Sequence, residues 1–137
     1  MENPESKAGA TGTGVNVKPE YHSLLNVLIE ALDQAQSGKG AERHNLTNDM
    51  PFERQRMQTI SELIGSVDGM TYQACKKITE GVKLPTLDRQ VAELLGAIVY
   101  LAGAIIFLRK QDMAKRKAAF FAGPLGEPAR DAAAPKK

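Results

Sequence analysis

The chain has 137 residues, a net charge of +2 and a single cysteine. This length allows one domain at most, and so small a net charge does not by itself indicate nucleic-acid binding. One cysteine excludes a disulfide framework and a zinc cluster built from thiolates. The opening stretch MENPESKAGA is polar and lacks the apolar segment of a signal peptide, so we expect a cytoplasmic protein.

Both ends of the chain have the composition of disordered tails. Residues 1–18 and 122–137 are rich in Gly, Ala, Pro and charged side chains and contain almost no large apolar ones. Such segments cannot bury enough surface to offset the entropy lost on ordering. A single helical domain at 19–121 remains. Its core is modest for its size, and contacts between subunits would add burial, so we expect an oligomer.

The first helix is predicted over residues 20–36. Pro19 fits the first turn of a helix, where its missing N–H is not needed. Apolar side chains then recur every three or four residues and form one stripe, and Gly38 ends the pattern. The stripe consists of Tyr21, Leu24, Leu25, Leu28, Leu32 and Ala35.

Two further helices are predicted over residues 51–64 and 71–82. Pro51 lies in the first turn of the earlier one, and Gly65 supplies its stop. Apolar residues at helical spacing define the inner face of each helix. These faces are Met57, Ile60, Leu63 and Ile64 in the first, and Ala74, Cys75, Ile78 and Val82 in the second.

The fourth and longest helix is predicted over residues 87–118, with Thr86 as its N-cap. It contains a run without charges, Leu94 to Leu108, which is about 22 Å long at 1.5 Å per residue. Because a hydrocarbon core is about 30 Å thick, the run favours a central buried helix, and a single membrane span is the alternative.

The fold class that follows is all-α: a small four-helix bundle-like domain with a long central C-terminal helix and disordered tails. No segment shows the alternating pattern of a strand. The helical spacing predicts a core that includes Leu28, Ile60, Ile78, Leu94, Ile98 and Leu101.

Small residues mark one face of the long helix. Gly96 and Gly103 lie two turns apart, with Ala92 one turn before Gly96. Small side chains let another helix approach closely, so this face is the predicted surface of a homo-oligomer. The alternative is that it admits the first or the second predicted helix of the same chain, at residues 20–36 or 51–64.

The stretch SGKGAERHNLTNDMPFERQ, residues 37–55, predicts an anion site in a loop. Glycines on both sides of Lys39 allow close approach of the backbone. Lys39 and Arg43 supply charge, and His44 and Asn45 supply hydrogen-bond donors suited to phosphate. Free N–H groups at the start of the next helix, near residues 48–52, would add to the site. The spacing is not that of a Walker motif, and a solvated linker is the alternative.

A resemblance to a known family covers about residues 62–105. The stretch GMTYQACKKITEG, followed by LDRQVAELLGAIVYLAGAI, resembles the second half of the all-α MazG-like nucleotide pyrophosphatases. The resemblance implies Mg²⁺ held by carboxylates, for which Glu62, Asp68 and Glu93 are the candidates. The chain departs from the family where a third acid of the first motif would stand, and Gly96 occupies the place of the later aspartate.

A basic run closes the long helix. Residues 109–117, RKQDMAKRK, hold five cationic side chains and one anionic one. A phosphate backbone or an anionic membrane surface could use them. No aromatic platform is interleaved with the charges, so a nucleic-acid partner is disfavoured and a solvated helix end is favoured.

These patterns lead to one preferred function. The stretches GKGAERHN, PFERQ and AELLGAIVYL resemble small accessory proteins of bacteriophages and prophages. The sequence favours a non-catalytic helical module that binds a nucleotide-like or other phosphorylated ligand and sequesters a host signalling nucleotide. It needs no cofactor. The alternatives are a MazG-like Mg²⁺-dependent nucleotide pyrophosphatase, a structural or protein-interaction module, and a small single-span membrane protein.

Overall fold

The computed structural model describes residues 14–38 and 50–123 of the chain. Within these ranges the fold is all-α, as the sequence predicted, and contains no strand. Short 3₁₀ turns at Pro19–Tyr21 and Phe52–Arg54 precede the first and second helices of this part. The α-helices are α1 (His22–Ser37), α3 (Arg56–Ile64), α4 (Asp68–Gly81) and α5 (Leu87–Phe121).

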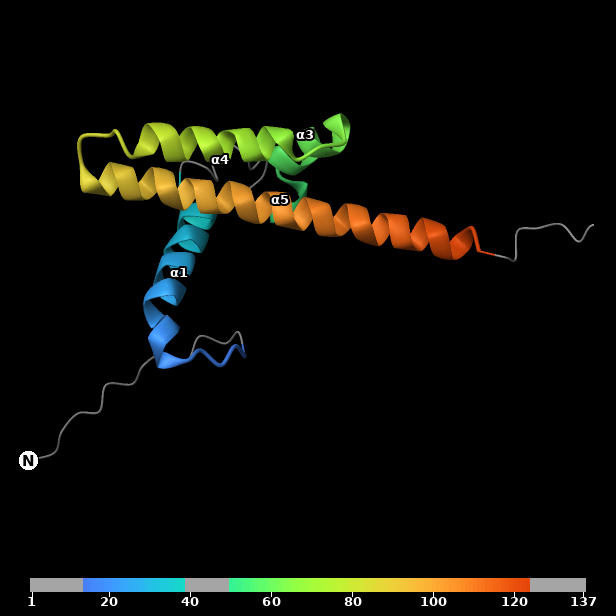
Figure 1. Ribbon diagram of the computed structural model, residues 1–137, viewed down its shortest axis with the longest axis horizontal. Helices are drawn as coiled ribbons and strands as arrows, with labels where there is room; N and C mark the ends of the chain where they lie inside the picture. Colours follow the sequence, from blue (N-terminus) through green and yellow to red (C-terminus); the bar gives the residue numbers. More distant parts are fainter. Residues whose placement is uncertain (1–13, 39–49, 124–137) are drawn as a thin grey trace, which may run out of the picture.

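Helices α4 and α5 form an antiparallel pair that organises the molecule (Figure 1). The turn between them is held by the Gln90 side chain, whose Nε2 donates to the carbonyl of Leu84 at 2.7 Å. Close approach at this end depends on Gly81, because a Cβ there would lie 2.6 Å from Cβ of Glu93. The last turns of α5 extend beyond the other helices (Figure 1).

Helix α1 crosses α5 steeply, and its N-terminal half projects away from the α4–α5 pair (Figure 1). Near the crossing, Nε2 of Gln34 donates to the carbonyl of Ala92 at 2.9 Å. Ala31 is the one residue of α1 that is fully buried. The helix is therefore anchored by its C-terminal half.

The core is small and lies where α3, α4 and α5 meet. Its buried members are Met57, Met70, Ala104 and Phe107. Gly103 lies among them, since a Cβ at this position would be 3.0 Å from the sulfur atoms of both methionines. Nε2 of Gln58 donates to the carbonyl of Gly103 at 2.9 Å, so a buried polar bond ties α3 to α5.

Helix boundaries agree with the sequence prediction to within two residues except at three places, one of which is the end of α5 at Phe121 rather than at residue 118. Gly65 ends α3 in the left-handed region at φ 75°, as a C-terminal glycine does. Helix α3 begins at Arg56 rather than at residue 51, because the chain first makes the 3₁₀ turn and then extends at Gln55. Helix α4 begins at Asp68 rather than at residue 71.

The predicted core was largely wrong in its details. Among its members, Leu28, Ile60 and Leu101 are each more than two-fifths exposed, and Ile98 is half-buried. The remaining two, Ile78 and Leu94, are also exposed. The buried positions are instead occupied by Met57, Met70, Leu95 and Phe107 and by small or polar residues, while many other large apolar side chains remain outside. Cys75, predicted to pack inside, is exposed as well.

Helix α5 is long and apolar enough to cross a membrane by length and composition. Its most apolar window has a mean hydropathy of 2.3, and 33% of that window is buried within the chain. A core helix of a soluble protein passes the same test. In the described part of the chain, one face of α5 is therefore buried, and apolar side chains also cover much of its exposed surface.

Candidate functional site

An apolar groove runs between α1 and α5, and the segment that leads into α3 adds to its lining. Its volume is about 630 Å³. Helix α1 contributes Leu28, Ala31, Leu32, Ala35 and Gln36, and α5 contributes Ile98, Val99, Ala102 and Ile106. Met50, Phe52 and Gln55 complete the lining. The volume falls in the range of small-molecule sites in proteins.

Gln55 is the polar residue that distinguishes this groove. It is 7% exposed. Its backbone carbonyl accepts hydrogen bonds from the N–H groups of Gln58 and Thr59 at the start of α3. Its side-chain amide has no hydrogen-bond partner within residues 14–38 and 50–123. A buried amide without a partner costs free energy, which a ligand in the groove could recover.

The predicted anion loop is flanked in the sequence by two residues that line this groove. Lys39, Arg43, His44 and Asn45 all lie outside the described residues, so their positions are not part of the site geometry. The residues that precede and follow the loop, Gln36 and Met50, both line the groove.

The predicted helix start beside the loop was wrong. We expected free N–H groups of a helix near residues 48–52. The described chain instead has extended backbone at Pro51, a single 3₁₀ turn and an α3 that starts at Arg56. The donors of an α-helical first turn are therefore displaced from the loop by about five residues.

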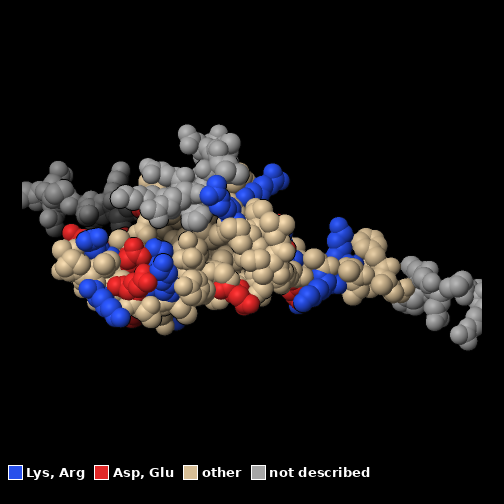
Figure 2. Space-filling view, turned by 90° about the horizontal axis from the view of Figure 1, so that it is seen from above, with Lys and Arg blue, Asp and Glu red and all other residues tan. Residues whose placement is uncertain are grey.

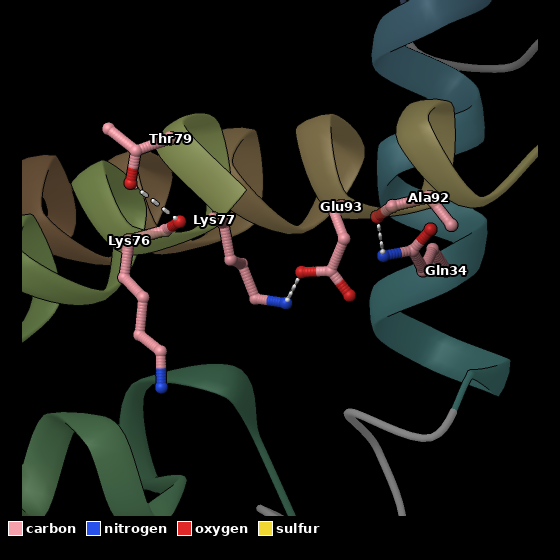
Figure 3. Close-up of polar contacts among 6 residues, drawn as sticks. All are labelled: Gln34, Lys76, Lys77, Thr79, Ala92 and Glu93. Carbon is pink, nitrogen blue, oxygen red and sulfur yellow. Dashed lines mark hydrogen bonds and ion pairs between the residues drawn. The ribbon is translucent and has the colours of Figure 1, made fainter. Parts of the chain in front are cut away.

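The three acids implied by the MazG-like resemblance do not come together. Glu93 pairs with Lys77, its Oε2 lying 2.7 Å from Nζ (Figure 3). Glu62 pairs with Lys110 at the other end of the domain. Since Glu93 and Lys110 are 17 residues apart on α5, about 25 Å separates the two pairs. Asp68 opens α4, and no group of three His, Cys, Asp or Glu side chains in the described ranges could hold a metal ion.

The glycine face of α5 packs within the same chain. Gly96 lies against the Lys77 side chain, whose Cε would be 3.0 Å from a Cβ at this position. Gly103 lies against the core methionines. Both glycines are buried, so the face predicted for a homo-oligomer is already occupied. The alternative interpretation named the first or second predicted helix. Met57 of the second, α3, does lie against Gly103, but Gly96 lies against Lys77 of α4, which that interpretation did not include.

The charged side chains are concentrated toward the ends of the α4–α5 pair, and a broad uncharged surface lies between them in the face shown in Figure 2. In the basic run, Lys110 pairs with Glu62, and Nε of Arg116 lies 2.7 Å from Oδ2 of Asp112. Two of the five cations of this run are therefore partnered by acids in the described chain.

Sequence reasoning did not identify the groove or Gln55. One signal was present, because Gln55, Gln58 and Ser61 recur every three residues and are all buried. A search for apolar periodicity does not register a polar inner face.

No family model, curated protein or solved structure matches this chain.

Proposed function

We propose that the chain is a non-catalytic binding module for a nucleotide-like ligand, with the base in the α1–α5 groove and the phosphate at the loop of residues 39–49. One observation carries the proposal: an apolar groove of about 630 Å³ contains a buried amide without a partner in the described chain, and Gln36 and Met50, which flank the loop in the sequence, line it.

The groove has the chemistry of a base pocket. A nucleobase is flat, has two apolar faces and carries donors and acceptors along its edge. Phe52 provides an aromatic ring, and Ile98 and Ala102 provide apolar surface. The Gln55 amide can both donate to and accept from the edge of a base. An apolar lining with few polar groups is the usual composition of ligand pockets.

Chain connectivity limits how far the loop residues can lie from the groove. Consecutive Cα atoms are 3.8 Å apart, so the Cα of Lys39 lies within about 11 Å of that of Gln36. By the same count, the Cα of Asn45 lies within about 19 Å of that of Met50. A phosphate attached to a base in the groove is separated from it by a sugar, a distance that these limits accommodate. Arg43 and His44, between them, would add charge and a donor.

Binding without turnover is the role that this arrangement supports. In a phage setting, such a module would sequester a signalling nucleotide of the host. Its biological effect would then depend on affinity and on the amount of protein.

Isothermal titration with three probes tests the proposal: adenosine, inorganic phosphate and a panel of adenine and guanine nucleotides, including cyclic ones. We expect nucleotides to bind more tightly than either part alone. Arg43→Ala should weaken nucleotide binding by roughly ten- to a hundredfold, because a charged hydrogen bond contributes about 1.5–3 kcal/mol. Arg89→Ala, on an exposed part of α5, is the matched control.

A second pair of variants tests the groove separately. Gln55→Met keeps the length of the side chain and removes its amide. We expect it to weaken nucleoside binding by about tenfold while the melting temperature stays the same or rises. Gln73→Met, on α4, is the control. If no nucleoside, nucleotide or phosphate binds at millimolar concentration, the proposal is wrong.

A further inference from the structure

An exposed seven-residue repeat runs along α5. Leucine recurs at 87, 94, 101 and 108, and a β-branched residue follows each of the first three leucines by four positions, at Val91, Ile98 and Ile105. We call these seven residues the heptad stripe. Leucine at one core position of a heptad and Val or Ile at the other is the pattern of two-stranded helical packing.

Most of the heptad stripe lies outside the packing within the chain. Its leucines are 72%, 37%, 44% and 51% exposed, in chain order. The buried residues of α5 fall at other heptad positions, among them Gly96, Gly103 and Phe107. At 100° per residue these positions lie on the side of the helix opposite the stripe. Only Ile98, which also lines the groove next to α1, is half-buried.

The repeat indicates a helix as the occupant, rather than lipid. A seven-residue period keeps one seam facing a second helix over several turns. A surface that contacts lipid needs no such period. The stripe also has a defined length: the next two heptad positions are Asp112 and Lys115, and Asp88 and Arg89 lie within its first turn.

We propose that the heptad stripe is the docking surface for a second copy of this chain, in which the two α5 helices pack along the repeat around a two-fold axis. A second copy presents the same stripe with the same period, which makes the surface self-complementary. From Leu87 to Leu108 the seam is about 32 Å long.

The heptad stripe alone is smaller than a standard interface, so the proposed dimer needs apolar surface from α1 as well. A half-exposed Leu, Ile or Val offers about 50 Å² of apolar surface, so seven residues offer about 350 Å² on each copy. A standard interface buries about 800 Å² per partner. Leu28 and Leu32 of α1 border the groove that Ile98 shares with the stripe, and both are about half exposed. The exposed side of α1 therefore extends the same apolar surface toward the partner.

Sedimentation equilibrium on the full chain at micromolar concentration tests this interface. We expect the parent to have twice the monomer mass of 14.8 kDa. Leu101→Glu places a charge in the seam and should raise the dimer Kd by about a hundredfold or more. Leu63→Glu is the control, because Leu63 is 84% exposed on α3 and lies off the stripe. It should leave the Kd unchanged.

If Leu101→Glu fails to fold by circular dichroism, Leu101→Ala replaces it, with an expected rise in Kd of about tenfold. A monomeric parent, or a dimer that Leu101 variants leave intact, overturns the proposal. Parent protein that inserts into vesicles of phosphatidylcholine and phosphatidylglycerol also overturns it, since lipid would then cover the stripe.

Discussion

Phe107→Ala is the substitution that best tests where the core lies. Phe107 is 2% exposed and belongs to the cluster with Met57, Met70 and Ala104. Truncating a buried phenylalanine to alanine costs about 3–5 kcal/mol, because apolar contacts are lost and a cavity remains. Domains of this size are stable by only about 5–15 kcal/mol, so a large part of the stability should disappear.

The matched variant is Leu63→Ala. The sequence pattern placed Leu63 on the inner face of its helix, but it is 84% exposed, so its truncation should change the stability by less than about 0.5 kcal/mol. Thermal unfolding followed by far-UV circular dichroism compares the two. Phe107→Ala should lower Tm by more than about 12 °C, at 4–8 °C for each kcal/mol. Equal shifts for the two variants would refute the assignment of the core.

Three further predictions concern glycines and an ion pair. Gly103→Leu should lower Tm sharply and independently of protein concentration, because the site is filled by core side chains; a change in oligomeric mass without a change in Tm would contradict this. Gly65→Ala should lower the free energy of unfolding by about 1–2 kcal/mol, because φ is 75° at this position. Gly69→Ala should raise it by about 0.5–1 kcal/mol, because open space surrounds its Cβ position. Urea unfolding of both variants would show whether the two changes have opposite signs. Lys77→Met should cost no more than about 1 kcal/mol, because Lys77 and Glu93 are both partly exposed; a larger loss in the same assay would mean that the pair supports the α4–α5 packing.

The existence and order of the helices could be predicted from the sequence, because local signals decide them. Pro19 and Gly65 mark a start and a stop through the backbone alone. Apolar spacing was sufficient to find α1 and α5. These signals act within a few residues and need no knowledge of the rest of the chain.

The inward-facing side of each helix could not be predicted in the same way. On α3 the buried residues are Met57, Gln58 and Ser61, and the apolar Leu63 and Ile64 are outside. Gln58 is buried because its amide reaches the carbonyl of Gly103, 45 residues away. A contact between residues so far apart in the sequence depends on how α3 packs against α5. The pattern of apolar residues within α3 carries no information about that packing.

Two candidate sites differ in how well the sequence could anticipate them. The anion loop was predicted from residue types alone, and it stays a prediction because the stretch from 39 to 49 lies outside the described residues. The groove needed the crossing of α1 over α5, since its lining comes from both helices and from the segment before α3. A pocket formed at a crossing has no signature in any single segment.

Helix α5 is apolar on nearly every side, and its separate faces account for this composition. The face with Gly96 and Gly103 packs against the chain's own α3 and α4. The face with Val99 and Ala102 lines the groove beside α1. The heptad stripe covers the remaining side and is largely exposed. A helix that faces lipid needs apolar residues on its surface but no division into separate faces. A helix with a different protein neighbour on each of three faces needs small residues on the first, groove-lining residues on the second and a leucine repeat on the third. The sequence has each of these on the matching side of the helix, which favours packing against protein as the reason that α5 is apolar.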